Sequence, residues 1–196
     1  ELFNEAQAQT ARDMAKEVND LDRRLAAIRA EENKLDAQKD VLRPWMDLDL
    51  PLETGSTSQV TIQLGTLPAN VPMNQAEGEL RAIGELAQLT EVYNAERDFH
   101  YCMLVCHASQ AEDVLEKLKA LGWSRANLRD WTGTAAENLG RLYQETKALR
   151  AEAASIEEKL AGMGELNAPL RQLSDLAGAN AQREESRGRL LDTAQT

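Results

Sequence analysis

Two narrow apolar stripes, one in each terminal part of the chain, most constrain how it can fold. In the first stripe the apolar residues recur in alternating steps of four and three: Met14, Val18, Leu21, Leu25, Ile28, Leu35 and Leu42. These steps are the spacing of the a and d positions of a heptad repeat. Glu32 and Lys39 fall on the same stripe and weaken it. Because the remaining positions are polar, the stripe is too narrow for a globular core and predicts a coiled-coil helix over residues 1–43.

A second stripe with the same steps follows Gly133 and predicts a returning helix over residues 134–196. Its positions are Leu139, Leu142, Thr146, Leu149, Ala153, Ile156, Leu160 and Met163. Thr134 and Glu137 have the spacing of a capping box, which marks where the helix begins. The first helix ends at the start of the middle segment, and the second helix begins at the end of that segment. We therefore expect the two helices to pair antiparallel, with Leu21 near Leu160.

Glycine and proline residues interrupt the returning helix. Gly162 and Gly164 lower its stability, and Pro169 removes a main-chain donor. These residues predict a bend around 162–170. The bend marks either the end of the coiled coil or a functional hinge, and the sequence leaves both open.

The middle segment, residues 44–133, alternates between strand and helix patterns. Strands are predicted at 59–68, 90–96, 99–108 and 126–131, and helices at 73–86 and 109–122. Val60, Ile62 and Leu64 are expected to face the core, and Ser109 with Glu112 is expected to cap the second helix. The order β-α-β-β-α-β is that of a ferredoxin-like lobe. The predicted fold class is therefore α+β, a long antiparallel two-helix coiled coil that carries this lobe at one end.

Three residues are predicted to form the joint between the coiled coil and the lobe. Pro44 stops the first helix because it restricts the residue before it and has no N–H. Trp45 has a large apolar ring that can pack at the joint and fix its angle. Gly133 directly precedes the cap of the returning helix.

The net charge of −11 is concentrated in the middle segment. Residues 44–133 carry 13 acidic and 6 basic side chains, whereas each flanking segment has a net charge of −2. A nucleic-acid partner is disfavoured because binding to a duplex needs lysine and arginine. A basic protein surface is the expected partner. The acidic side chains outside the predicted apolar helix faces are the candidate contacts: Glu77, Glu85, Glu112, Asp113 and Glu116.

The chain lacks the sequence motifs that usually indicate a catalytic or ligand-binding site. It contains no glycine-rich phosphate-binding motif. His100, Cys102, Cys106 and His107 are the metal-ligand types that cluster, but in one strand the first and third of them lie roughly 20 Å apart. We predict no catalytic residue, metal, cofactor or small-molecule substrate. Two unpaired thiols suit a reducing compartment, and no apolar run reaches the ~20 residues of a membrane span.

Three stretches in a fixed order resemble the cytoplasmic arm of rotary V-type ATPases, the subunit I or subunit a family. They are the corner RPWMDLDLPLE, the turn GTLP after the first strand, and WTGTAAENLGRLYQE at the start of the returning helix. The resemblance covers nearly the whole chain. It implies an out-and-back coiled coil with a small α/β lobe, acting as a non-catalytic stator that links the membrane domain to the peripheral stalks and supports ion transport. It also implies a longer parent chain with a membrane domain, and a place on the cytoplasmic side of a membrane complex.

Other classes of protein fit parts of the pattern. The main alternative is a coiled-coil interaction module whose ferredoxin-like lobe senses a ligand or binds a partner, although no glycine-rich ligand loop is evident. A nucleic-acid arm is disfavoured by the acidic lobe. A chromosome-type hinge would need a larger, glycine-rich dimerising lobe, and part of an enzyme would need catalytic residues.

Overall fold

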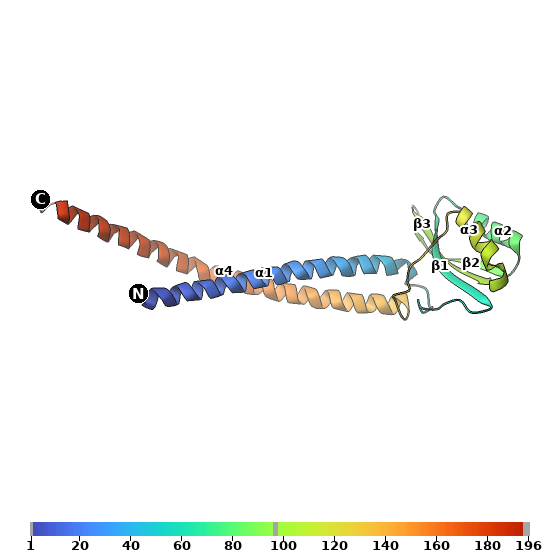
Figure 1. The fold of residues 1–196 in the computed structure, drawn as a ribbon, viewed down its shortest axis with the longest axis horizontal. Coiled ribbons are helices and arrows are strands. Elements are labelled where there is room, and N and C mark those ends of the chain that lie inside the picture. Colours follow the sequence, from blue (N-terminus) through green and yellow to red (C-terminus); the bar gives the residue numbers. More distant parts are fainter. Residues whose placement is uncertain (1, 96–97, 194–196) are drawn as a thin grey trace. The chain divides into compact units, whose positions relative to one another are not determined.

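The computed structural model describes the backbone of residues 2–95 and 98–193, and the side chains of residues 5–94 and 98–165. The long helices are α1 (Leu2–Leu42) and α4 (Ala135–Thr193). The segment between them contains the short 3-10 helix η1 (Arg43–Trp45), four strands and two further helices (Figure 1). By compactness the chain divides into two units, Glu1–Glu31 with Ala148–Thr196, and Glu32–Lys147.

The first unit is a pair of packed helices. Its core consists of Leu25, Ile28 and Ile156, with Leu21, Leu149, Ala153 and Leu160 packed against it. Arg24 donates two hydrogen bonds to Glu152 across the pair, at 2.6 and 2.8 Å. Leu21 and Leu160 therefore belong to one cluster, as the two stripes predict. Over the described side chains, residues 5–42 of α1 and 135–165 of α4, the buried and half-buried positions follow the predicted steps of three and four.

The second unit contains an antiparallel sheet covered on one face by two helices. Its strands are β1 (Val60–Pro68), β2 (Ala87–Ala95), β3 (Phe99–His107) and β4 (Ser124–Arg125), in the order β2-β3-β1-β4. The helices are α2 (Met73–Ile83) and α3 (Ala111–Ala120). Both pack on the face that carries Cys102, Leu104 and Cys106, and they form one core with it (Figure 1). The chain order β1-α2-β2-β3-α3-β4 is the predicted order.

The prediction that Val60, Ile62 and Leu64 face the helix-covered core is wrong. Ile62 lies opposite Val105, and Leu64 lies opposite Met103. Opposed residues in an antiparallel pair share a face, so these side chains point to the other face of the sheet. All three are half-buried, as are Thr61 and Gln63 between them. Because both faces of β1 are partly covered, the apolar alternation did not identify the side that the helices cover.

Two local predictions in the last third of the lobe are also wrong. The predicted strand at 126–131 is a loop, and β4 consists of Ser124 and Arg125 alone. Ser109 does not cap a helix with Glu112. It lies in the 3-10 turn η2 (Ala108–Gln110), where its N–H donates to the ring of His107, and α3 begins afterwards without a side-chain cap.

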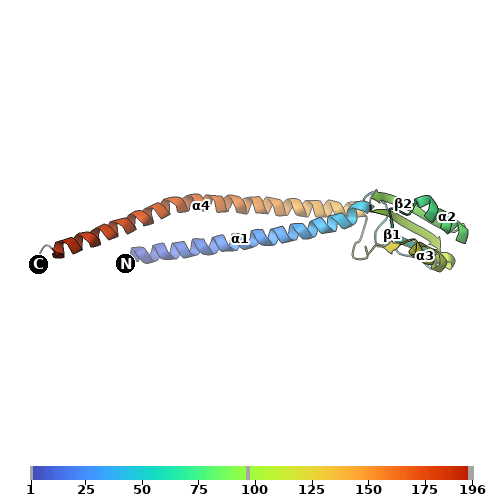
Figure 2. The ribbon, with the colours of Figure 1, turned by 90° about the horizontal axis from the view of Figure 1, so that it is seen from above.

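Helix α4 is continuous through Gly162, Gly164 and Pro169. Figure 2 shows that it changes direction where its colour passes from orange to red, in the region of the predicted bend. A hinge function for this bend remains a prediction. In the part of the chain that the structure describes, no helix is both long enough and apolar enough for a membrane span.

Candidate functional site

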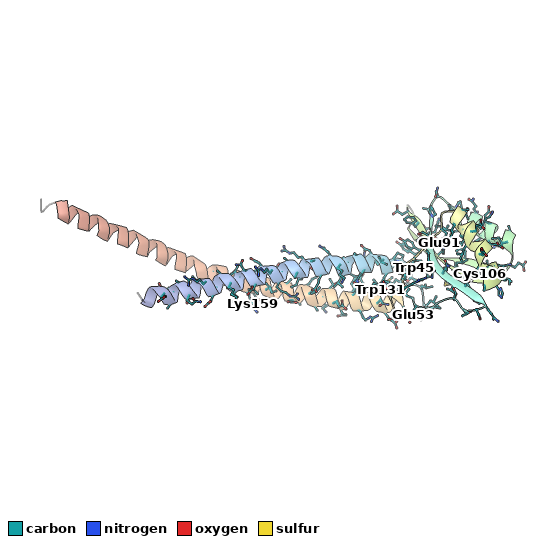
Figure 3. The ribbon with its side chains drawn as sticks, viewed as in Figure 1. Trp45, Glu53, Glu91, Cys106, Trp131 and Lys159 are labelled. Atoms are coloured by element: carbon teal, nitrogen blue, oxygen red, sulfur yellow. The ribbon has the colours of Figure 1, made fainter. Side chains whose placement is uncertain are left out.

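Pro44 and Trp45 form the turn where α1 ends. Pro44 occupies the first turn of η1, a position where its missing N–H costs no hydrogen bond. The Trp45 side chain (labelled in Figure 3) is only 2% exposed. Its ring packs edge-on against Tyr101 of β3 with the centroids 5.5 Å apart. Tyr93 of β2 packs on the same Tyr101 at 5.8 Å. Trp45 therefore anchors the end of α1 to the sheet face that α2 and α3 leave uncovered.

Gly133 closes the other side of the joint. Its backbone has φ of +77°, which favours glycine. Its N–H donates to the Glu53 carboxylate at 2.7 Å, and its carbonyl accepts from the Leu52 N–H at 2.9 Å. A Cβ at this position would lie 2.6 Å from the Glu137 carboxylate. The corner loop after η1 thus returns to the residue that precedes α4, a contact between segments 80 residues apart.

The predicted capping box at the start of α4 is present. The Thr134 hydroxyl accepts from the Glu137 N–H at 3.2 Å, and the Glu137 carboxylate accepts from the Thr134 N–H at 2.8 Å. Asn138, which no sequence pattern singles out, is buried and donates to the carbonyls of Thr132 and Thr134. These contacts fix the first turn of α4 directly beside Gly133.

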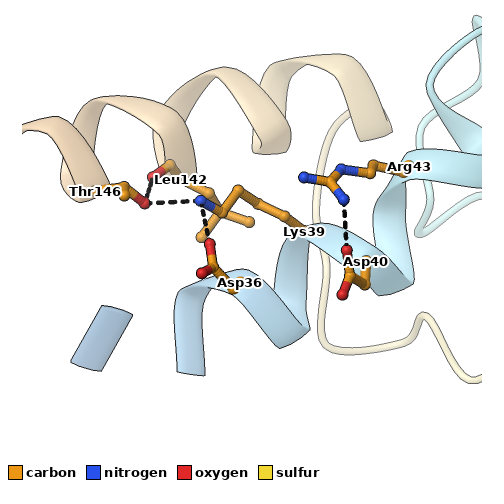
Figure 4. Close-up of polar contacts among 6 residues, drawn as sticks. All are labelled: Asp36, Lys39, Asp40, Arg43, Leu142 and Thr146. Carbon is orange, nitrogen blue, oxygen red and sulfur yellow. Dashed lines mark hydrogen bonds and ion pairs between the residues drawn. The ribbon is translucent and has the colours of Figure 1, made fainter. Parts of the chain in front are cut away.

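Lys39 is the main feature near the joint whose role sequence reasoning missed. On the sequence alone Lys39 is a polar interruption that weakens the stripe, but in the structure it is 3% exposed and has partners. Its Nζ lies 2.7 Å from Asp36 and donates to the Thr146 hydroxyl at 3.0 Å (Figure 4). The same Nζ lies 5.1 Å from the centroid of the Tyr143 ring. The Thr146 hydroxyl in turn donates to the Leu142 carbonyl at 2.8 Å. The sequence feature that could have predicted this contact is the pair of polar residues, Lys39 and Thr146, on facing positions of the two stripes.

Arg43 continues this polar row beside the buried lysine. It pairs with Asp40 at 2.6 Å (Figure 4). A hydrogen bond to the Tyr143 hydroxyl, together with the nearby Asp40 carboxylate, raises the pKa of Arg43. Lys39 and Arg43 therefore both lie near Tyr143.

The five acidic candidates lie on or next to α2 and α3 but do not form a surface of one sign. Glu77 is 3.9 Å from Arg81 of the same helix. Lys117 of α3 pairs with Glu79 of α2 at 2.9 Å, which ties the two helices together. Among the described residues, no basic side chain pairs with the four remaining candidates, which are exposed: Glu85, Glu112, Asp113 and Glu116. Their contact with a partner remains a prediction.

The cysteines and histidines of β3 belong to separate environments. Burial, with a smaller contribution from Glu91, raises the pKa of the Cys102 thiol to about 12, and burial also raises the pKa of Cys106. His100 lies 3.3 Å from Glu91, and His107 contacts Ser109. Within the described residues, no three His, Cys, Asp or Glu side chains are grouped closely enough to hold a metal ion.

Comparison with known proteins gives a match at the level of structure. No family model matches the chain, and no curated protein matches it. A solved structure that does match is the crystal structure of the cytoplasmic N-terminal domain of subunit I, homolog of subunit a, of V-ATPase. The two chains are 13% identical, with a TM-score of 0.47, and the match covers 82% of this chain and 52% of that chain. The chain therefore spans about half the length of that solved domain.

Proposed function

We propose that this chain is a non-catalytic stator arm of a rotary V-type ATPase. In this role the two long helices form a coiled-coil lever, and the βαββαβ lobe is a ferredoxin-like end-piece that docks to the peripheral stalks. The arm acts on the cytoplasmic side of a membrane complex. It supports ion transport by resisting the torque of the rotor.

The observation that carries the proposal is the way the resembling stretches meet. The corner RPWMDLDLPLE and the stretch WTGTAAENLGRLYQE lie far apart in sequence, yet the main chain of Leu52 and the carboxylate of Glu53 bond to Gly133. Two of the three stretches on which the family resemblance rests therefore meet in one joint.

The charge of the lobe supports a protein partner at this end. Residues 44–133 carry a net charge of −7, and at least four of the candidate acidic side chains have no ion pair within the described residues. Charges at the rim of an interface act mainly on the association rate and make it depend on salt. A stalk protein with a basic surface is the partner that these charges favour.

Binding of purified stalk heterodimer to the chain tests the proposal. We expect binding at low salt that weakens near 0.5 M, where the Debye length falls to about 4 Å. Neutralising the five candidates to glutamine or asparagine should slow association. A matched control neutralises five exposed acids of the long helices: Asp13, Glu17, Asp20, Glu157 and Glu158. If binding does not change with salt concentration, the proposed contact through the acidic side chains is wrong. If the heterodimer does not bind at any salt concentration, the stator role of this lobe is wrong.

A further inference from the structure

The two edges of the sheet differ in how their main-chain groups are satisfied. An edge strand presents N–H and C=O groups that invite another strand, and proteins usually block such edges. In the order β2-β3-β1-β4, one border is β2 and the other is β1 with its two-residue neighbour β4. Because β4 pairs only with Gly65 and Thr66, most of the outer edge of β1 needs another form of protection.

The edge of β1 is closed by the loop before it. The Thr57 N–H donates to the Val60 carbonyl at 2.8 Å, and the Thr57 hydroxyl accepts from the Val60 N–H at 3.0 Å. The Ser56 hydroxyl accepts from the Ile62 N–H at 3.1 Å and donates to the Ile62 carbonyl at 3.4 Å. The Leu64 carbonyl accepts from the N–H of Ala126 at 2.8 Å. Every second residue of this edge therefore has a partner, up to the start of β4.

Among the described residues, the edge of β2 has no comparable main-chain partners, although η1 (Arg43–Trp45) lies close to this strand. Over its nine residues, the main-chain bonds that the structure describes run to β3 alone. It contains no proline or lysine, and its one charged residue, Glu91, lies beside His100 of the neighbouring strand. The strand is open to solvent at five side chains: Gln88, Thr90, Glu91, Tyr93 and Asn94. The bulge between Glu91 and Tyr93 is the one protective irregularity in this described strand.

We propose that the open edge of β2 binds an extended segment of a partner protein that carries lysine or arginine, which adds a fifth strand to the sheet. The free groups are main-chain donors and acceptors in strand spacing, which an extended segment matches and a helix does not. The bulge interrupts regular pairing, so the added strand is expected to pair over Ala87–Glu91. The exposed Leu86 and Tyr93 side chains, 57% and 47% accessible, flank this stretch and offer apolar contacts.

The net negative charge of the chain favours a basic partner protein over a second copy of the chain at this edge. Each copy carries a net charge of −11, with −7 in residues 44–133, so two copies repel each other on approach. A basic extended segment is attracted by the same field. The proposal concerns a different surface from the acidic side chains of α2 and α3, and it does not require that the chain be a stator.

Amide hydrogen exchange of the intact chain, measured residue by residue by NMR, tests this edge. The probe is a nine-residue peptide of alternating lysine with valine or threonine, acetylated and amidated at its ends. Two control peptides have the same sequence as this parent peptide. Each is N-methylated on a different set of alternate residues, so that one of the two edges of the peptide strand has no N–H donors. We expect the parent peptide to slow exchange at least tenfold in amides of Ala87–Glu91, and the peptide methylated on its pairing edge to have no effect. A third control with glutamate in place of lysine should bind at least tenfold more weakly.

The following results would contradict the proposed strand addition at β2. Unchanged exchange in β2 at millimolar peptide excludes an added strand, and equal effects of the parent and both methylated peptides exclude main-chain pairing. Protection that grows with protein concentration and without peptide assigns the edge to a second copy. Binding of the stalk heterodimer to the same sample separates the two proposals. Stalk binding without a peptide effect removes this inference alone, and a peptide effect without stalk binding removes the stator role alone.

Discussion

At the scale of single residues, the joint depends on a few side chains with large contact areas. Trp45 is the clearest case, because its ring is almost fully buried and lies edge-on to Tyr101. We expect Trp45→Ala to lower the free energy of unfolding by about 3 kcal/mol or more, since it removes apolar contact and leaves a cavity. Urea denaturation measures the change, and Trp131→Ala is the matched control because the Trp131 ring is only half-buried. An unchanged midpoint for Trp45→Ala would mean that the ring does not hold the joint.

Gly65 provides a second prediction at this scale. A Cβ there would lie 2.4 Å from the ring of Trp123 and 2.6 Å from the Ser124 carbonyl, both closer than real contacts allow. Gly65→Ala should therefore destabilise the lobe by about 1–3 kcal/mol through overpacking. Gly78→Ala is the control, because Gly78 lies in α2 with nothing within 4 Å of the new Cβ. This control should gain up to about 1 kcal/mol from helix propensity. Changes of the same sign in both variants would refute the steric explanation.

At the scale of elements, periodicity determined how well the sequence predicted the fold. The stripes of α1 and α4 were predictable because a step of three or four fits one geometry, and their buried residues are the expected ones. β3 was predictable because it is a long apolar run. The orientation of β1 was not, because residues on both faces of this strand are half-buried, so an alternation of apolar residues does not show which face the helices cover.

The candidate site was predicted in part for the same reasons. Pro44, Trp45 and the Thr134 capping box follow local rules that the sequence displays directly. The bond between Glu53 and Gly133 joins segments 80 residues apart, so local patterns carry no sign of it. The buried position of Lys39 was missed because a lysine on an apolar stripe suggests a break in the packing. Its hydrogen-bond partner Thr146 lies on the other helix, and sequence spacing alone does not identify that partner.

The Lys39 cluster leads to a prediction about the helix pair. Removing one partner of a buried charge leaves the charge poorly solvated, whereas replacing the whole polar group with apolar side chains is often neutral or stabilising. Thr146→Val should therefore destabilise the chain by about 1–2 kcal/mol. The double variant Lys39→Met with Thr146→Val should regain at least the stability of the natural chain. Lys34→Met, at an exposed position of the same helix, controls for the lost charge.

A double-mutant cycle of denaturation curves isolates the interaction between these two residues. The predicted coupling between Lys39 and Thr146 is favourable and of order 1 kcal/mol. Additive effects of the two changes would show that the 3.0 Å hydrogen bond contributes nothing measurable.

At the scale of the whole molecule, the distribution of charge and of thiols determines how the chain can be studied and what it can bind. The long helices carry mixed charges, and the acidic surplus is in residues 44–133. Both native thiols are buried, and burial raises the pKa of each, so neither is readily ionised near neutral pH. Introduced surface cysteines can therefore be labelled in preference to Cys102 and Cys106.

That selectivity allows a direct test of the antiparallel pairing. Leu21 and Leu160 pack in one cluster, so spin labels at these two positions should lie within about 15 Å of each other, given helix axes roughly 8–10 Å apart. Leu149 lies eleven residues before Leu160 on α4, which corresponds to about 16 Å along a helix. Labels at Leu21 and Leu149 should therefore give a clearly longer distance. Electron–electron double resonance measures both distances in the intact chain. If the pair that includes Leu149 is the shorter one, or if Leu21 and Leu160 are more than about 30 Å apart, α1 and α4 are not paired antiparallel in this register.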